Sequence, residues 1–386
     1  MSSRPLHIVY PAYNSNIVEW MFELERLRSW EIHGSTLPAL FFQIKTVFHV
    51  LESLGSARIE GNRTTIDELV EQHIDGAPDA TEPLREIANI EDALKYIEDE
   101  FAKDPLRRID AEFICELHRL VVKNLRARTE GGEGDERPGT YRSEQVHITS
   151  SSHIPPSPTK IDALMHELVE FINTTQNARE DLLRIAMAHH RFTFVHPFIN
   201  GNGRVVRLIT YAMLVRARFR VSDGRIINPT AVFCHDRNAY MQHLSVADAG
   251  TDEALMHWCE FVIGGLHREL IRVYELLNID SLREIVLVPA LQQAHTKGLI
   301  NAKELHVLHA SLEDQIVNST FFKRHYPSMS ASSLSQTIAL YKKKRLIVPF
   351  PNASSRKYAL MITGPLLRHV IAALDTAGFL PPSRDM

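Results

Sequence analysis

The chain has 386 residues, of which 44% are hydrophobic and 23% are charged, a balance typical of a folded, globular protein. This length is enough for two or three domains. The net charge of −4 provides no global attraction to nucleic acid or to an anionic membrane, although a local basic patch is still compatible with it.

Cysteine spacing and the lack of targeting patterns indicate the cellular compartment. Its three cysteines, Cys115, Cys234 and Cys259, are far apart and form no CxxC pair, which favours a reducing compartment and argues against a cysteine zinc site. No run of about 18 apolar residues is present, so no membrane span is predicted. The N-terminal segment 1–14 lacks the basic start and apolar run of a signal peptide. A cytoplasmic location is therefore expected.

Apolar residues recur at a spacing of three to four residues through most of the first 280 positions, which predicts a mostly α-helical fold. A further helix is expected from Gly203 to about Arg218. Between the helices, segment 137–158 has a Pro-Gly start and a Ser/Pro-rich exit, and predicts a surface loop or small hairpin. The segments with helical spacing are 37–54, 82–102, 109–125, 161–175, 180–194 and 252–277.

The last hundred residues differ in texture. Helical patterns at 302–314, 318–326 and 331–344 are followed by two strand-like runs, 345–350 and 356–362. The order of helix, helix, turn, helix and two-stranded ribbon is that of a winged helix-turn-helix. We therefore expect three domains: an N-terminal helical segment (1–90), a central core (91–280) and a winged-helix domain (281–386).

The most informative stretch is HPFINGNGRVVR, at 196–207. Gly201 and Gly203 flank Asn202, and helical spacing begins directly after them. Such a turn aims free backbone N–H groups at one point, where the helix dipole adds positive potential, and this suits a diphosphate or triphosphate. Arg204 and Arg207 lie three residues apart in the first turn of this helix, so both guanidinium groups can reach the same anion.

His196 stands at the start of the same loop, where an imidazole can act as a general base near neutral pH. Taken separately, a histidine before proline and a Gly-Asn-Gly turn are more often structural than functional. Their combination within a dozen residues favours a phosphate site.

The string at 196–207 resembles the signature of Fic-domain proteins. Segment 186–198 resembles the helix that leads into that signature, segment 138–148 the family's flap, and segment 56–62 its inhibitory motif. The resemblance covers roughly residues 30–280. It implies a Fic-type helical bundle with a small β-hairpin flap, and a protein adenylyltransferase that moves AMP from ATP to a Ser, Thr or Tyr hydroxyl of a target protein.

The resemblance also implies a role for each part of the site. His196 would take the proton from the target hydroxyl, and the 201–203 turn would hold the α- and β-phosphates through its backbone and the Asn202 amide. Arg204 would contact the β-phosphate and Arg207 the γ-phosphate. The flap would hold the target segment by strand addition.

Asn200 departs from the family pattern, which has an acidic residue here that binds the Mg²⁺ bridging the phosphates. An amide oxygen can coordinate Mg²⁺ but brings no negative charge. Three outcomes stay open: weakened transfer in which the nucleotide itself holds the metal, use of another phosphate donor, or nucleotide binding with little chemistry. Because the rest of the loop is intact, we favour a retained transferase.

The segment SARIEGN places Ser56 and Glu60 four residues apart, on one side of a helix end, and Gly61 supplies a stop. These residues are also consistent with a plain helix terminus that carries a solvated glutamate. The resemblance implies an inhibitory motif, in which Glu60 pairs with Arg207 and occupies the place of the γ-phosphate.

Segment 237–240 resembles the family's nucleobase side, so Tyr240 is a candidate to pack on adenine. A core tyrosine on a helix is an equally good interpretation. The many histidines include no HExxH pattern and predict no zinc site.

The C-terminal segment supports a second class of function. Its helix at 331–344 begins with Ser332, Ser333, Ser335 and Gln336 and ends in the basic run 342–345, which suits contacts to DNA phosphates, a docking protein, or simply water. The alternative is a nucleotide-sensing DNA-binding regulator with a weakened Fic site. Fic proteins often pair, so a homodimer is open to this chain as well.

Overall fold

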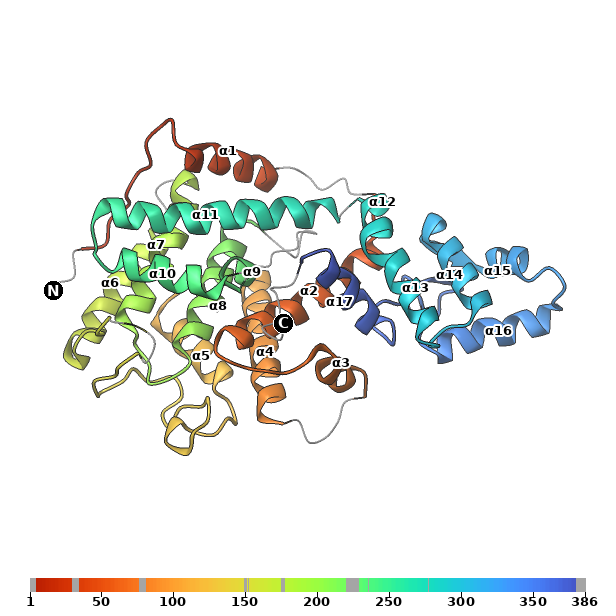
Figure 1. The fold of residues 1–386 in the computed structure, drawn as a ribbon, viewed down its shortest axis with the longest axis horizontal. Coiled ribbons are helices and arrows are strands. Elements are labelled where there is room, and N and C mark those ends of the chain that lie inside the picture. Colours follow the sequence, from red (N-terminus) through yellow and green to blue (C-terminus); the bar gives the residue numbers. More distant parts are fainter. Residues whose placement is uncertain are drawn as a thin grey trace. The chain divides into compact units, whose positions relative to one another are not determined.

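The computed structural model describes residues 5–29, 35–75, 81–148, 151, 153–174, 178–219, 229–234, 236–276 and 278–379. These residues are mostly helical (Figure 1). None of the helices they form is long and apolar enough to cross a membrane. The chain folds into two compact units, Met1–Glu31 with Leu51–Thr64 and Asp79–Ile271, and Ile32–Val50 with Thr65–Pro78 and Arg272–Met386. The division into three domains stays a prediction.

The first unit contains the segments that resemble the Fic signature, its flap and its inhibitory motif. Short 3-10 helices lie at Arg128–Glu130, Pro158–Lys160 and Ala178–Glu180. The α-helices that lie wholly or partly in this unit are α1 (Asn16–Ser29), α2 (Pro38–Ile59), α4 (Glu82–Lys103), α5 (Ala111–Val121), α6 (Ile161–Asn173), α7 (Asp181–Val195), α8 (Asn202–Arg216), α9 (Pro229–Cys234), α10 (Arg237–Ala247) and α11 (Asp252–Glu275).

Helix α8, the predicted helix of the signature, forms the centre of this unit. Helices α4, α5, α7 and α9 pack against it, and nearly all of its side chains are buried. A helix that is buried on all sides needs apolar residues around its whole circumference, as the run from Val205 to Val215 supplies. The beginning of α8 is thereby held rigidly by the core.

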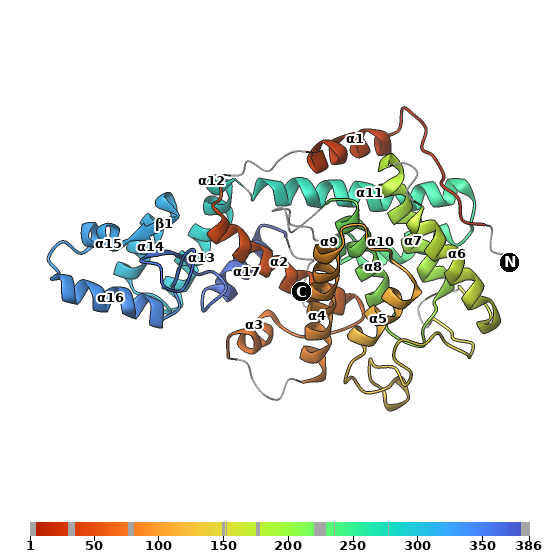
Figure 2. The ribbon, with the colours of Figure 1, turned by 180° about the vertical axis from the view of Figure 1, so that it is seen from behind.

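Helix α1 lies beside α11 in both views of the ribbon (Figures 1 and 2). A Cβ atom added at Gly264 of α11 would lie only 2.7 Å from the Trp20 ring. The absence of a side chain at Gly264 is therefore what allows α1 to approach so closely.

The predicted β-hairpin flap is not formed in the part of 137–158 that the structure describes, which has no strand. The guanidinium of Arg142 accounts for this difference. It donates hydrogen bonds to the backbone carbonyls of Glu144 (2.9 Å), Pro156 (2.7 Å) and His196 (2.8 Å). These carbonyls are thus satisfied without a ladder, and Pro155 and Pro156 have no N–H to donate to one.

The second unit contains the three helices and two strands predicted for the C-terminal segment, although the winged-helix assignment itself stays a prediction. Three strands pair in the order β1–β3–β2, all antiparallel, with Ile316 opposite Ala359 and Ile347 opposite Leu360. A π-helical turn spans Arg283–Leu287. The elements are α3 (Ile66–Asp75), α12 (Ile279–Leu282), α13 (Val288–Thr296), α14 (Ala302–Asp314), β1 (Ile316–Asn318), α15 (Ser319–His325), α16 (Ala331–Lys343), β2 (Ile347–Pro349), β3 (Lys357–Leu360) and α17 (Leu367–Thr376).

Candidate active site

The signature loop connects α7 to α8 and is held by its own side chains. The Asn202 amide donates to the carbonyl of Phe198 and accepts from its N–H, both at 2.9 Å, while the Phe198 ring is fully buried. Gly201 has a φ of 74°, which lets the chain turn into α8. Since both ends of the Asn202 amide are used inside the loop, its contact with phosphate stays a prediction.

His196 ends α7 in a left-handed conformation, with a φ of 50°. Its backbone carbonyl accepts a hydrogen bond from Arg142 Nε at 2.8 Å. Burial and the nearby charge of Arg142 lower the pKa of His196 to about 4. The imidazole is therefore neutral at pH 7 and able to accept a proton.

A carboxylate lies at the start of α8. A Cβ atom added at Gly203 would come within 2.1 Å of Glu60 Oε1, so this oxygen lies directly against the glycine backbone. The same oxygen accepts a hydrogen bond from Arg207 Nη2 at 2.7 Å. The expected position of a bound anion is thus where the Glu60 carboxylate sits.

Arg207 is almost fully buried, and residues of the predicted motif at 56–60 bind its guanidinium. Its Nε donates to Ser56 Oγ at 2.9 Å, and its Nη2 donates to the Ser56 carbonyl at 3.0 Å. Although burial opposes ionisation of Glu60, the charge of Arg207 and its hydrogen bond hold the pKa of Glu60 below its usual value. Gly61, with a φ of 105°, follows the end of α2.

Arg204 is equally buried and is held by two carboxylates that sequence reasoning missed. Its guanidinium lies 3.1 Å from Glu86 Oε1 and 3.4 Å from Glu133 Oε2, and Nη2 donates to the Glu133 carbonyl at 2.7 Å. Glu86 Oε2 in turn accepts a hydrogen bond from Asn62 Nδ2 at 2.8 Å. No motif marks Glu86 or Glu133, because only the fold brings α4 and the loop at 133 to Arg204.

The surroundings of Asn200 do not fit a Mg²⁺ ion held by the protein. Its amide oxygen accepts a hydrogen bond from Gly201 N at 2.8 Å, and its Nδ2 lies 3.5 Å from Glu133 Oε2 and 3.4 Å from the Gly134 carbonyl. Within the described ranges, no group of three His, Cys, Asp or Glu side chains is arranged to hold a metal. The amide oxygen is thus already engaged, and the carboxylate beside it belongs to the Arg204 cluster.

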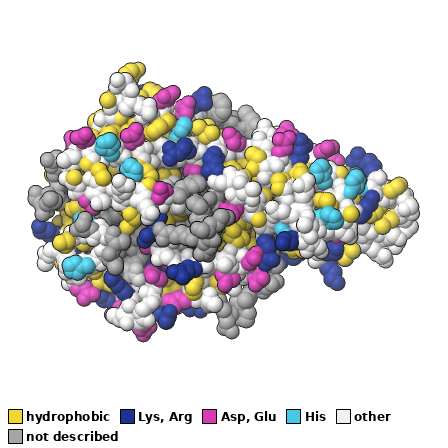
Figure 3. Space-filling model, in the orientation of Figure 1, with side chains coloured by type: hydrophobic (Ala, Val, Ile, Leu, Met, Phe, Trp, Pro, Cys, Tyr) yellow, Lys and Arg dark blue, Asp and Glu magenta, His cyan; other side chains and the backbone are white. Residues whose placement is uncertain are grey.

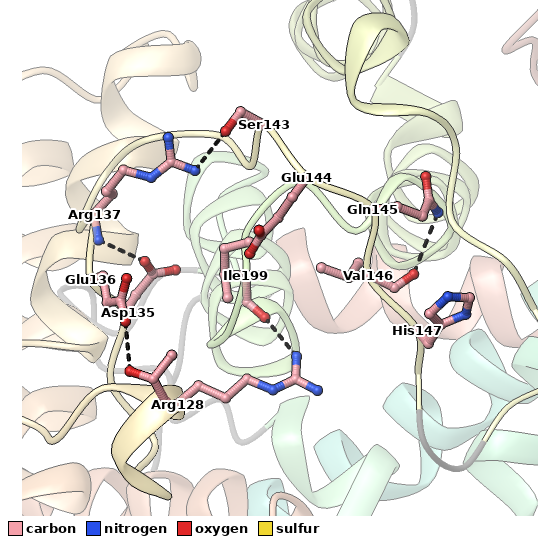
Figure 4. Close-up of a pocket in the computed structure, with 11 residues that line it drawn as sticks. Arg128, Asp135, Glu136, Arg137, Ser143, Glu144, Gln145, Val146, His147 and Ile199 are labelled. Atoms are coloured by element: carbon pink, nitrogen blue, oxygen red, sulfur yellow. Dashed lines mark hydrogen bonds between the residues drawn. The ribbon is translucent and has the colours of Figure 1, made fainter.

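A pocket of about 740 Å³ lies between the loop at 128–137 and the segment 143–147, with Ile199 of the signature loop on its wall (Figure 4). Its rim is fixed by hydrogen bonds from Arg137 to Ser143 (3.0 Å) and from Thr129 to Glu136 (2.6 Å). Basic and acidic side chains both line this pocket. Segment 143–147 belongs to the stretch 138–148 that resembles the Fic flap.

Tyr240 lies beside Arg207, with whose side chain it forms a hydrogen bond. It is 3% exposed and packs with Phe233, His189 and Trp258, and its hydroxyl lies 2.9 Å from His189 Nε2. The structure therefore places this ring in an aromatic core, and a contact with adenine stays a prediction.

The segment that carries the signature loop matches a known protein family. Residues 108–214, which span α5 to most of α8, match the model of the Fic/DOC family. The matched region contains the signature loop at 196–207.

Relatives of the Fic/DOC region include two curated proteins named protein adenylyltransferase Fic. The one from Drosophila grimshawi is 29% identical over 208 residues, which cover 52% of this chain and 38% of the relative. The one from Nematostella vectensis is 28% identical over 199 residues, which cover 50% of this chain and 42% of the relative. This chain therefore spans less than half the length of these distant relatives.

Two solved structures share the fold. A Fic family protein from Desulfovibrio desulfuricans matches with a TM-score of 0.54 and 20% identity, over 92% of this chain and 98% of the other. Fic-1 from C. elegans, residues 134–508, matches with a TM-score of 0.51 and 20% identity, over 67% of this chain and 72% of the other. These two likenesses show that the chain has the mostly helical Fic fold.

Proposed function

We propose that the protein is a protein adenylyltransferase, which moves AMP from ATP to a Ser, Thr or Tyr hydroxyl of a target protein and is restrained by Glu60. The observation that carries this proposal is the Glu60 carboxylate, which lies against Gly203 at the start of α8 and 2.7 Å from Arg207. A carboxylate at this point is what a phosphate-binding site attracts when no nucleotide is bound. The curated relatives of the Fic/DOC region support the reaction class.

In the proposed reaction, the neutral imidazole of His196 takes the proton of the target hydroxyl as its oxygen attacks the α-phosphorus. The bond between the α-phosphorus and the α,β-bridging oxygen breaks, and pyrophosphate leaves with the electron pair. Backbone N–H groups of the 201–203 turn and the guanidinium of Arg207 stabilise the negative charge on the phosphates. Most of the acceleration comes from positioning the two reactants.

The pocket between 128–137 and 143–147 is the proposed site of the target segment. Segment 143–147 has no strand partner among the residues the structure describes. An extended peptide can therefore pair with its backbone at positions other than the Glu144 and Val146 carbonyls, which side chains already bind. Ile199 lines the pocket three residues after His196, which brings a bound hydroxyl near the imidazole.

The proposal is tested by incubating the Glu60→Gly variant with α-labelled ATP and, separately, with γ-labelled ATP. We expect protein labelling from the α-label only, and its loss when His196→Ala is added. No label in a folded Glu60→Gly variant would contradict the proposed reaction, and label from γ-labelled ATP would identify another phosphate donor reaction.

A DNA-binding regulator is the second candidate, favoured by the surface of α16. Exposed residues of this helix include Ser332, Ser333, Gln336, Lys342 and Lys343, which suit contacts with DNA if α16 is a recognition helix. Against it, basic and acidic side chains are interspersed on the face shown in Figure 3. Binding of the full chain to duplex DNA that weakens steeply with salt, without any labelling activity, would support the regulator.

A further inference from the structure

His118 of α5 contacts two loops of the site although it lies outside every motif described above. Its side chain is fully buried. The Gly139 N–H donates to its Nδ1 at 2.8 Å, and its Nε2 lies 3.2 Å from the carbonyl oxygen of Asn200. Its ring stacks on Phe198 with 3.8 Å between ring centroids and 8° between planes.

These contacts fix which nitrogen carries the hydrogen. Since Nδ1 accepts the Gly139 N–H, it has no proton, so the neutral ring carries its hydrogen on Nε2. That hydrogen points to the Asn200 carbonyl, and Asp135 Oδ2 lies 3.6 Å from the same nitrogen. Burial lowers the pKa of His118 to about 4, which keeps the ring neutral near pH 7.

We propose that His118 is a positioning residue that holds the nucleotide-binding turn through Nε2 and the entry to the target-binding segment through Nδ1. Asn200 directly precedes the 201–203 turn, and Gly139 precedes segment 143–147. The turn also packs tightly against the end of α5. A Cβ atom added at Gly201 would lie 3.1 Å from Val122 and 3.4 Å from His118.

This assignment rests on the proposed function, but its two halves are separable by substitution. A glutamine places its amide nitrogen near the position of Nε2 and keeps the donor to Asn200. An asparagine places its oxygen near the position of Nδ1 and keeps the acceptor for Gly139. Each variant therefore removes one hydrogen bond and retains the other.

The test uses the full chain with Glu60→Gly as the parent and ATP as the probe. We expect His118→Asn to weaken ATP binding, measured by calorimetry, by about tenfold, the usual effect of one lost buried hydrogen bond. We expect His118→Gln to keep the ATP affinity within about twofold but to slow self-labelling at saturating ATP by about tenfold.

Unchanged ATP affinity in a folded His118→Asn variant would overturn the assignment. So would parallel losses of ATP affinity and labelling in both variants, because these would show a merely structural role. ATP binding is measured without transfer, so an inactive parent contradicts the proposed function but still tests the Nε2 contact. If both variants misfold, a ¹⁵N-histidine spectrum of the parent at pH 7 decides: an Nε2–H tautomer supports the assignment, and an Nδ1–H tautomer overturns it.

Discussion

Arg207 and Glu60 are 147 residues apart in the sequence and form an ion pair of 2.7 Å at the start of α8. The Arg207 side chain is 2% exposed, whereas the Glu60 side chain is 29% exposed. The guanidinium is therefore a fixed part of the core, and the carboxylate is the replaceable partner at the edge of the site. A triphosphate that takes the place of Glu60 would again give Arg207 an anionic partner.

Removal of the Glu60 carboxylate is expected to strengthen ATP binding. Glu60→Gly should bind ATP about tenfold more tightly than the native chain, because the nucleotide no longer displaces an ion pair. Without ATP, the same variant should melt at a lower temperature, since Arg207 is left buried and unpaired. Calorimetry and thermal unfolding measure the two effects.

Glu68→Gln provides a control, because Glu68 is exposed and accepts hydrogen bonds from Thr65, away from the candidate active site. It should leave ATP affinity unchanged. Equal ATP affinity in the native chain and in Glu60→Gly would show that Glu60 does not compete with the nucleotide.

Glu86 is expected to restrain Arg204 as Glu60 restrains Arg207. Burial raises the pKa of Glu86, although the charge of Arg204 opposes this shift. Keeping the Glu86 carboxylate ionised in the folded state therefore costs free energy. Glu86→Gln should keep the hydrogen bond from Asn62 but remove the charge. We expect ATP to bind about threefold more tightly and the free energy of unfolding to fall by about 1–3 kcal/mol. Urea unfolding and calorimetry check both, and an ATP affinity equal to that of the native chain would exclude the restraint.

The signature and the two arginines were predictable because residues close in the sequence carry them. The same holds for the helix end at Ser56 and Glu60, where spacing alone places both side chains on one face. The partners Glu86, Glu133 and His118 were not predictable, because each reaches the site only through the packing of α4, α5 and a distant loop. Of the two structures predicted for 137–158, a loop or a small hairpin, the described part shows the loop, in which Arg142 binds the carbonyls of Glu144 and Pro156.

In the second unit, helical patterns in the sequence predicted α14, α15 and α16. The structure adds a capping box of Asn301 and Glu304 that begins α14. Strand β1 escaped prediction because it has only three residues and pairs with β3, some forty positions later.

Asn200→Asp is expected to make transfer more dependent on Mg²⁺. The new carboxylate would face Glu133, whose Oε2 lies 3.5 Å from the present Asn200 Nδ2, so two like charges would meet. Added Mg²⁺ should therefore raise the melting temperature of the variant and increase labelling from α-labelled ATP in the Glu60→Gly background. The measurement is a MgCl₂ titration with EDTA as the control. If labelling does not increase and its metal dependence does not change, then a metal ion at position 200 does not contribute to transfer.

Glu91 of α4 is expected to make stability fall as pH rises. Its Oε1 is buried and has no hydrogen-bond partner among the described residues. Burial and the nearby Asp92 raise its pKa to about 7 from the ordinary value of 4.5. A carboxyl with a raised pKa binds its proton more tightly in the folded state, so folding loses free energy as pH rises from the unfolded value through the folded value.

Glu91→Gln removes this titration while it keeps the shape of the side chain. Between pH 5 and pH 8, the native chain should lose on the order of 2 kcal/mol of stability relative to the variant, as the shift in pKa requires. Urea unfolding at both pH values measures this difference. The control is Glu253→Gln, at an exposed position of α11, which should have the same pH dependence of stability as the native chain. If the native chain and Glu91→Gln have parallel pH profiles, then Glu91 ionises in the folded state as readily as it does in water.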